Sequence, residues 1–512
     1  MAANNTKKQL SINVIWTLAV LLINTLTSFI LTPYITQTLG IEAYGFITLA
    51  DNFVSYIDIV IVSLNSLAAR YITISYHKKQ YEEAQKFFNS VLTADLFLSF
   101  VITVLFAAVI NRLEWFIQIP DQLIDDVKIL FALVIVNYLI NMCGVVFKAC
   151  VYIKNRMDYI SKTDLAKLIF KIIILVSLFS VFKPHVWYVT LSLIPGTMLV
   201  FIVFTRLTRK LTPELKIDFH KASLKSVLEI VSVGIWNSVN SLGNTLNSGL
   251  DLLAANIWIS PIAMGELSIA QKISSIMMQF LSNLSGVFAP LQLEDYAKGE
   301  KKQILNNLVF CMKSTGMFCI VCFCVYFSVG LNFLSLWIPE ENISAINILT
   351  RIVLTGNIIV GICYPLYYVN TLTKKLKIPC VVTICSGLTN VFSMWLLVSN
   401  TSLGVYAVVL TTLVINWVTN FTFVPMYAAK SLGLKVTAFL PTVFRYLFAL
   451  LASLLGCILI HQVVALRNSW LFLFVECVIY GLISVIIAGL FFLNSKERKL
   501  FIQYLLRIIV KR

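Results

Sequence analysis

The chain alternates between long apolar runs and short polar segments. A helix needs about 20 predominantly apolar residues to cross the hydrocarbon core of a bilayer, and the apolar runs reach roughly that length. Only helices and closed barrels satisfy their backbone hydrogen bonds in lipid, and barrel strands are much shorter than these runs. We therefore predict an all-α integral membrane protein with about fourteen transmembrane helices, at 10–35, 43–69, 87–111, 124–150, 165–183, 186–205, 227–252, 262–288, 305–333, 346–372, 380–399, 402–426, 439–462 and 470–493.

Lysine and arginine are distributed unevenly over the segments between these runs. With the N-terminus placed in the cytoplasm, 33 of the 40 Lys and Arg residues fall on cytoplasmic segments and 5 on outer segments. Cytoplasmic loops of membrane proteins carry such an excess of positive charge. The pattern predicts a multi-pass protein of the bacterial cytoplasmic (inner) membrane with both termini in the cytoplasm. The same pattern explains the net charge of +16 by cytoplasmic loops that face anionic lipid, so we do not expect nucleic-acid binding.

Composition argues against several other classes of protein. Hydrophobic residues make up 59% of the chain and charged residues 12%, whereas soluble domains carry about 25% charged residues. The extramembrane segments are too short to hold a soluble catalytic domain, so we do not expect an enzyme. The 4 histidines and 11 cysteines show no metal-ligand spacing, and the sequence contains no nucleotide-binding motif. We therefore expect neither a metal ion nor a cofactor.

The two halves of the chain resemble each other. Trp16 aligns with Trp236 and Ser28 with Ser248, both at an offset of 220 residues, and with one residue fewer Ile119–Leu130 lies over Ile338–Leu349. Six predicted helices separate the copies, so the repeats have parallel topology, which is a transporter architecture with the substrate site between the halves. We predict two parallel six-helix lobes followed by two additional helices and a basic cytoplasmic tail, with bounds at 1–226, 227–438 and 439–512.

Two stretches of the sequence resemble a known family. The first is FILTPYITQTLGIEAYGFITLADNFVSY (Phe29–Tyr56), in which Thr32-Pro33, Leu39-Gly40 and Tyr44-Gly45 carry the match, and the second is TLTKKLKIP (Thr371–Pro379). Both are similar to bacterial polysaccharide flippases. These are the O-antigen and capsular repeat-unit exporters of the multidrug/oligosaccharidyl-lipid/polysaccharide (MOP) superfamily.

The resemblance implies a MATE-like, V-shaped bundle of two lobes whose cavity opens alternately to each side. Such a protein moves an undecaprenyl-pyrophosphate-linked oligosaccharide outward for O-antigen, capsule or exopolysaccharide assembly. The implied partners are this lipid-linked oligosaccharide, membrane lipids, and a polysaccharide polymerase with its chain-length regulator. Three alternatives stay open: a drug/cation antiporter of the same superfamily, a flippase for another lipid such as the peptidoglycan precursor, and a membrane-embedded glycan polymerase, which needs a larger outer loop.

Two aspartates mark one face of the second predicted helix. Asp51 and Asp58 are seven residues apart, a spacing that returns to the same side of a helix, and Ser55 and Asn65 extend the polar stripe. Ionisable residues at membrane depth are costly and usually face a cavity. We interpret Asp51 and Asp58 as a candidate proton or sodium coupling site that could also bind sugar hydroxyls. A polar seam between helices is the structural alternative.

The seventh predicted helix carries a stripe of carboxamides. Asn240, Asn244 and Asn247 recur at steps of three and four residues and so share one face. Carboxamides suit sugar hydroxyls because each one donates and accepts hydrogen bonds. They also suit hydrogen bonding between membrane helices, so both interpretations remain.

Lys272 lies within the predicted span 262–288, roughly 15 Å from the outer end of that helix. Positive charge at this depth suits a pyrophosphate, the group that the family resemblance implies. Lys272 is therefore the candidate pyrophosphate-binding residue, with Gln279 two turns further on. A buried salt bridge to Asp51 or Asp58 is the alternative role.

Arg70 and Lys148 lie nearer the inner ends of their predicted helices. A basic cytoplasmic mouth would gather pyrophosphate, which makes both residues candidates for substrate binding. Snorkelling of their long side chains toward the headgroups explains them equally well.

Overall fold

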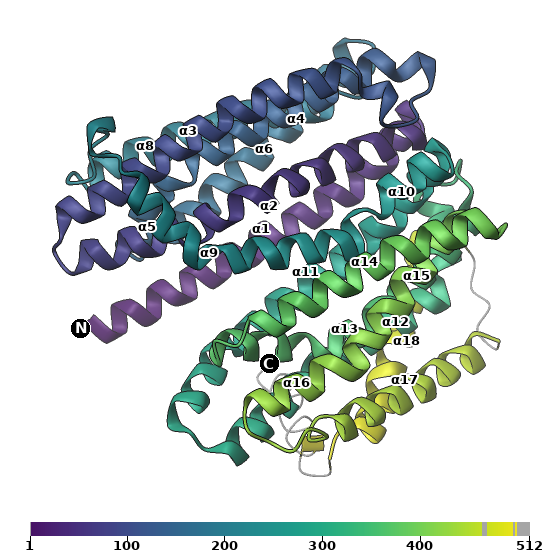
Figure 1. The fold of residues 1–512 in the computed structure, drawn as a ribbon. Helices are drawn as coiled ribbons and strands as arrows, with labels where there is room; N and C mark the ends of the chain where they lie inside the picture. The colour runs from purple at the N-terminus through teal and green to yellow at the C-terminus, as the bar shows by residue number, and fades with distance from the viewer. Residues whose placement is uncertain (1, 463–467, 495–496, 499–512) are drawn as a thin grey trace. The chain divides into compact units, whose positions relative to one another are not determined.

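The computed structural model describes residues 2–462, 468–494 and 497–498, and the regular elements within these ranges are all helical (Figure 1). The first half of the chain forms α1 (Ala2–Leu39), α2 (Ile41–His77), α3 (Tyr81–Asn111), α4 (Ile124–Gly144), α5 (Ala149–Ile153), α6 (Asp158–Val181), α7 (Tyr188–Leu191), α8 (Ile194–Leu211), α9 (Leu224–Asn244) and α10 (Asp251–Trp258). The second half forms α11 (Pro261–Lys298), α12 (Lys301–Trp337), α13 (Ile343–Leu372), α14 (Lys377–Asn400), α15 (Val405–Val418), α16 (Val424–Ser431), α17 (Leu440–His461) and α18 (Trp470–Phe492).

Short turns of other helix types join several of these elements. They are the 3₁₀ turns η1 (Leu113–Trp115), η2 (Asp121–Leu123), η3 (Val146–Lys148) and η4 (Phe219–Lys221), and the π-helical turns η5 (Thr245–Gly249) and η6 (Thr419–Phe423). A π-helical turn leaves backbone groups without their usual α-helical partners. In η5 the phenol of Tyr56 donates to the backbone oxygen of Gly249 at 2.7 Å, and so ties this turn to α2.

Eleven helices in the described part of the chain are long and apolar enough to cross a membrane. The other three predicted spans fall on α6, on α9 with η5 and α10, and on α11, which are helical but carry more polar residues. The prediction of an all-α membrane protein is therefore confirmed, and the count of fourteen stays a prediction. The closely spaced spans 165–183 and 186–205 correspond to α6, which ends at Val181, and to α7 with α8, which begin at Tyr188.

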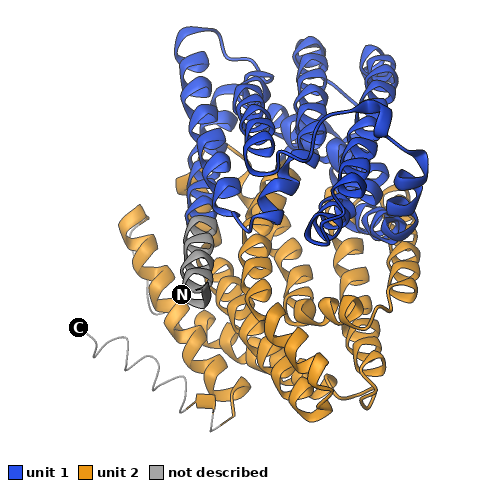
Figure 2. Ribbon diagram, turned by 90° about the vertical axis from the view of Figure 1, so that its left-hand side faces the viewer, with its two compact units in different colours: residues 1–265 blue, residues 266–512 orange. Residues whose placement is uncertain are grey.

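The chain divides into two compact units, Met1–Gly265 and Glu266–Arg512, which are coloured separately in Figure 2. Unit 1 includes α9 and α10, because α9 packs along α2. At this contact a Cβ added to Gly234 would lie 1.8 Å from the backbone oxygen of Ser63. The predicted lobe boundaries at 226/227 and 438/439 follow the sequence repeat and remain a prediction.

The residues that carry the family resemblance have structural roles in unit 1. Gly40 joins α1 to α2 with φ at +88°, a conformation that side chains with a Cβ rarely adopt. Gly45 lies against the start of α11, where an added Cβ would come within 3.0 Å of the Gly265 backbone. The hydroxyl groups of Thr32 and Tyr44 share a hydrogen bond of 3.3 Å between α1 and α2. The motif therefore fixes how these helices meet.

The core of unit 1 surrounds α2, which contacts α3, α4, α5 and α9. Its inner part is a cluster of buried apolar side chains that includes Ile72, Phe88, Phe147 and Phe204. Lipid tails are as apolar as these side chains, so close van der Waals packing holds membrane helices together more than exclusion of water does. The Phe88 and Phe147 rings pack edge to face with their centroids 5.5 Å apart.

Unit 2 is built around α12, which packs against α13, α17 and α18. Small residues allow the helices to approach: a Cβ on Gly361 of α13 would lie 2.2 Å from the Cys319 sulfur of α12. Near the start of α12, the buried Lys313 ammonium forms an ion pair with Glu497 at 2.7 Å. Glu497 follows α18, so this pair joins a residue beyond that helix to α12 within unit 2.

Candidate functional site

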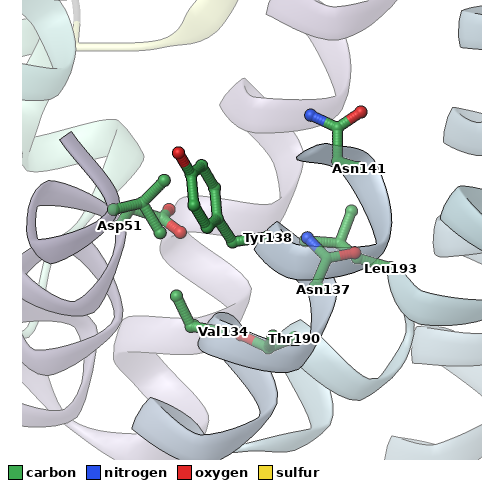
Figure 3. Close-up of a pocket in the computed structure, with 8 residues that line it drawn as sticks. Asp51, Val134, Asn137, Tyr138, Asn141, Thr190 and Leu193 are labelled. Atoms are coloured by element: carbon green, nitrogen blue, oxygen red, sulfur yellow. The ribbon is translucent and has the colours of Figure 1, made fainter. Parts of the chain in front are cut away.

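A cavity of about 160 Å³ opens in unit 1 between α2, α4 and the segment that joins α7 to α8 (Figure 3). Its lining is mostly polar or amphipathic, and consists of Asp51 and Val54 from α2, Val134, Asn137, Tyr138 and Asn141 from α4, and Thr190 and Leu193. One of the two predicted ion-coupling residues, Asp51, therefore lines a cavity.

The cavity offers hydrogen-bonding groups of complementary kinds. Asp51 supplies carboxylate acceptors, the two asparagines supply amides that donate and accept, and Tyr138 and Thr190 supply hydroxyl groups. The carboxamide oxygen of Asn137 accepts a hydrogen bond of 2.7 Å from Thr197 of α8, which orients this side chain. Such a set suits the hydroxyl groups of a sugar. The oxygen ligands also suit a hard cation.

Tyr138 connects the two predicted ion-coupling residues. It lines the cavity together with Asp51, and its phenol donates a hydrogen bond to Asp58 with 2.5 Å between the oxygens. Asp58 is half-buried on α2. The seven-residue spacing thus directs both carboxylates toward α4, as expected for two residues on one helix face. Their role in ion coupling stays a prediction.

In the asparagine stripe of α9 and η5, some side chains are exposed and others form hydrogen bonds within the protein. Asn240 and Asn244 are exposed. Asn247 lies in the π-helical turn η5 and donates to the backbone oxygen of Gly243 at 3.0 Å. One turn before Asn240, Asn237 donates to the hydroxyl of Ser66 on α2, also at 3.0 Å. Asn240 and Asn244 are therefore the members of the stripe best placed to meet a ligand.

The two basic candidates of unit 1 are absent from the cavity lining. Arg70 is exposed on α2. Lys148 in η3 is half-buried, and its ammonium lies 6.0 Å from the centre of the Phe204 ring. Lys148 also acts electrostatically on Asp164 and Lys167 of α6. It therefore belongs to a mixed group of charges on η3 and α6.

The remaining candidates belong to unit 2. Lys272 is half-buried on α11, and Gln279 is exposed seven residues later on the same helix face. The backbone oxygen of Lys272 accepts a hydrogen bond of 2.7 Å from Ser275, and that of Gln279 accepts one of 2.8 Å from Asn283.

Sequence reasoning missed several residues of the cavity. Asn137 and Asn141 lie at positions i and i+4 in an apolar run, which is a readable signal for a shared polar face. Thr190 gave no such signal, because it lies in the short helix α7 and only the tertiary fold brings it to the cavity. Asp95 is also an ionisable residue deep within a predicted membrane span, 87–111, as Lys272 is in its own span. It was not among the candidates predicted from the sequence.

The described residues hold no group of three His, Cys, Asp or Glu side chains that could bind a metal ion. The eleven cysteines are all free thiols.

The long apolar helices define an integral membrane protein that carries polar and charged residues within its membrane helices. Residues 10–292 match the model of the family described as "Polysaccharide biosynthesis protein", and the chain belongs to that family. Over 494 residues it is 24% identical to "Uncharacterized membrane protein EpsK" of Bacillus subtilis (strain 168), covering 96% of this chain and 97% of that protein.

Two solved structures share the fold. The lipid II flippase MurJ in its inward closed conformation aligns with a TM-score of 0.67 at 14% identity, covering 94% of this chain and 98% of MurJ. An inward-facing MATE family multidrug resistance transporter of the MOP superfamily aligns with a TM-score of 0.66 at 13% identity, covering 83% of this chain and 97% of that transporter. The proteins that share the fold are flippases and transporters, not enzymes.

Proposed function

We propose that the protein is a flippase for a lipid-linked oligosaccharide. By alternating access it moves undecaprenyl-pyrophosphate-linked repeat units across the cytoplasmic membrane for the assembly of a surface polysaccharide such as O-antigen, capsule or exopolysaccharide. One observation carries the proposal: a member of a polysaccharide biosynthesis family has the fold of a lipid II flippase over 94% of its length. Lipid II is itself a lipid-linked sugar, so family and fold point to the same substrate class.

The polar side chains of unit 1 support binding of the sugar part. Asp51, Asn137 and Asn141 bring acceptors and donors to one cavity, and Asn240 and Asn244 present exposed amides on α9. Asn247 contributes by holding the π-helical turn through its bond to Gly243. Sugar hydroxyls need this mixture because each one donates and accepts.

Lys272 is the proposed contact for the pyrophosphate. It lies eleven residues into α11, about 16 Å along the helix axis, and is half-buried. A lysine at this depth offers a compact positive charge for phosphate oxygens. Gln279, on the same face of α11, is proposed to bind an adjoining oxygen. Arg70 and Lys148 are proposed to gather the pyrophosphate at the inner ends of their helices.

The ion that drives transport is proposed to act through Asp51 and Asp58, since carboxylates both titrate and ligate hard cations. The excess of positive charge on alternate segments supports cytoplasmic termini and an inner-membrane location. Reporter fusions after Arg112 and Lys216 should then read as outside and inside, respectively. A polymerase and its chain-length regulator are proposed to receive the flipped repeat units.

A drug/cation antiporter is the second candidate. The likeness to the MATE family transporter favours it, and so does the carboxylate in the Asp51 cavity. The two functions differ in what accumulates when the protein is absent. Loss of an antiporter makes cells sensitive to cationic drugs and leaves lipid-linked oligosaccharides unchanged.

The proposal is tested by deleting the gene and measuring lipid-linked repeat units. We expect these lipids to accumulate on the inner leaflet while surface polysaccharide disappears. Wild type should restore export, Lys272→Ala should not, and Lys272→Arg should restore it in part because the charge remains. Lys298→Ala is the matched control, since Lys298 is exposed on the last turn of the same helix and pairs with Glu294.

Two results would overturn parts of the proposal. If the deletion leaves lipid-linked repeat units at wild-type levels, the flippase function is wrong. If Lys272→Ala exports normally, or if Asp51→Asn restores export to Lys272→Ala, Lys272 is a structural partner and not a substrate contact.

A further inference from the structure

Asp95 is an acidic residue buried inside unit 1. It lies on α3, eight residues into the predicted span 87–111 and so about 12 Å from the start of that span. Its side chain is 0% exposed. A carboxylate at such a position is expensive unless it is neutralised, because neither water nor lipid solvates it there.

The contacts of Asp95 leave two hydrogen-bond acceptors without a donor. The carboxamide nitrogen of Asn65 on α2 donates to Asp95 Oδ1 at 3.2 Å. The other carboxyl oxygen, Asp95 Oδ2, is buried and has no partner, and the same is true of the carboxamide oxygen Asn65 Oδ1. The two unmatched acceptors therefore belong to the two side chains that already meet.

A single proton on Asp95 would remove both unmatched acceptors. When Asp95 Oδ2 is protonated, its O–H becomes a donor for Asn65 Oδ1, and the existing bond from Asn65 to Asp95 Oδ1 remains. The two side chains then form the paired hydrogen bonds typical of a carboxylic acid with a carboxamide. A hydronium ion gives up the proton and becomes a water molecule, so one O–H bond breaks and one forms on Asp95 Oδ2. Both side chains are then neutral.

No lysine or arginine lies close enough to Asp95 to replace that proton within the described residues. Its one side-chain hydrogen bond is to Asn65. Tyr138 and Cys143 of α4 lie within electrostatic reach of Asp95. The charged groups on the elements packed around the N-terminal half of α3 are Arg70 on α2, Lys148 on η3, His220 and Lys221 on η4, Lys225 and Glu229 on α9, and Glu82, Glu83 and Lys86 on α3 itself. Asp58 lies seven residues from Asn65 on α2.

None of these groups forms an ion pair with Asp95. Arg70, Lys225 and Glu229 are exposed, and Lys221 donates to Gln85, ten residues before Asp95 on α3. Asp58, one heptad from Asn65 on α2, accepts the hydrogen bond from Tyr138. The described groups around Asp95 thus include no cation paired with it.

We propose that Asp95 and Asn65 form a proton-binding site between α3 and α2, and that this proton is released and rebound during transport. Tyr138 links the pair to the cavity, because it lines the cavity and interacts electrostatically with both Asp58 and Asp95. Release during transport rests on the proposed flippase function. The bound proton does not rest on it, so each part has its own test.

The bound proton is tested by infrared spectroscopy of the full chain in lipid nanodiscs at neutral pH. The difference spectrum between wild type and Asp95→Asn should contain the C=O stretching band of a protonated carboxylic acid, and the band should shift in D₂O. The difference spectrum for Asp51→Asn should lack it, because Asp51 lines an open cavity. If Asp95→Asn removes no such band, or if the band appears only when sodium is withdrawn, the proton site is refuted.

Release during transport is tested by flipping of lipid-linked oligosaccharide in proteoliposomes across a pH gradient. Asp95→Asn keeps a donor and an acceptor toward Asn65, so it should reach wild-type levels in the membrane and lose the response to the gradient. The double variant Asn65→Asp/Asp95→Asn moves the acid to the other helix and should regain that response. Unchanged response in Asp95→Asn, or failure of the swap to regain it, contradicts proton release at this pair. Absence of flipping by wild type contradicts the flippase function instead.

Discussion

The phenol of Tyr138 on α4 donates a hydrogen bond to Asp58 on α2 with 2.5 Å between the two oxygens. The same ring lines the cavity that Asp51 enters. Tyr138 is thus hydrogen-bonded to Asp58 and lines the same cavity as Asp51, the two carboxylates that the sequence predicts as ion-coupling candidates. The bond therefore joins α2 to α4 beside the cavity.

Removing this hydroxyl should destabilise unit 1. Tyr138→Phe leaves the ring in place and deprives Asp58 of its donor, at a cost of about 1–3 kcal/mol for a bond to a charged group. Thermal denaturation in detergent measures the loss. Asp58→Asn and the double variant complete a mutant cycle. Strictly additive losses would show that the two side chains do not interact.

The close contact between α9 and α2 should not tolerate a methyl group. In Gly234→Ala the new Cβ would lie 1.8 Å from the Ser63 backbone oxygen, so the helices must separate. Overpacking of this kind costs roughly 3 kcal/mol. Gly489→Ala on α18 is the control, because nothing lies within 4 Å of its added Cβ. Size-exclusion chromatography after heating should show loss of Gly234→Ala at temperatures that Gly489→Ala survives. Equal survival would argue against this helix crossing.

The loop between α3 and α4 forms hydrogen bonds with the buried side chain of Asn256. Asn256 of α10 accepts from the backbone nitrogen of Gln118 at 2.9 Å and donates to its backbone oxygen at 3.0 Å. Asn256→Ala leaves the backbone nitrogen and oxygen of Gln118 without their hydrogen-bond partner, which should lower the free energy of unfolding by about 1–3 kcal/mol. The loop should then become accessible to proteases. Gln118→Ala keeps both bonds, because they involve the backbone of Gln118, and loses only the exposed bond from its side chain to the Ile257 backbone oxygen. It should therefore be more resistant than Asn256→Ala. Equal cleavage of the two variants is the contrary result.

The ion pair between Lys313 and Glu497 should contribute measurably to the stability of unit 2. Lys313 is 5% exposed and its partner Glu497 is 27% exposed. Glu497→Gln leaves a buried ammonium with a weaker acceptor, and we expect a loss of roughly 2 kcal/mol after allowing for the exposure of Glu497. Glu294→Gln breaks the exposed pair with Lys298 and should cost less than about 0.5 kcal/mol. Unfolding of both variants against wild type measures the difference.

The helices could be predicted because hydropathy is a local property of each segment. All fourteen predicted spans fall on helices, including the pair 165–183 and 186–205, whose separation by Lys183 and Pro184 matches the end of α6 at Val181. The π-helical turns at Thr245–Gly249 and Thr419–Phe423 had no sequence signal. They depend on tertiary contacts such as the bond from Tyr56 to Gly249.

The site was only partly predictable, because contacts between residues far apart in the sequence leave no local pattern. Asp51 and Asp58 could be assigned to one face from their spacing alone. The pairing of Asn65 with Asp95, and that of Tyr138 with Asp58, joins residues 30 and 80 positions apart. Helical periodicity says which side of a helix a residue occupies, and it does not say which neighbour that side meets.

The flippase function is tested most directly by the purified protein in proteoliposomes that contain an undecaprenyl-pyrophosphate oligosaccharide. A membrane-impermeant glycosidase added outside reports how much of the sugar faces outward. We predict that wild-type protein makes the inner-leaflet pool accessible over time, that Lys272→Ala leaves it protected, and that Lys298→Ala behaves as wild type. If the inner pool stays protected in wild-type proteoliposomes as it does in protein-free vesicles, the protein does not flip this lipid.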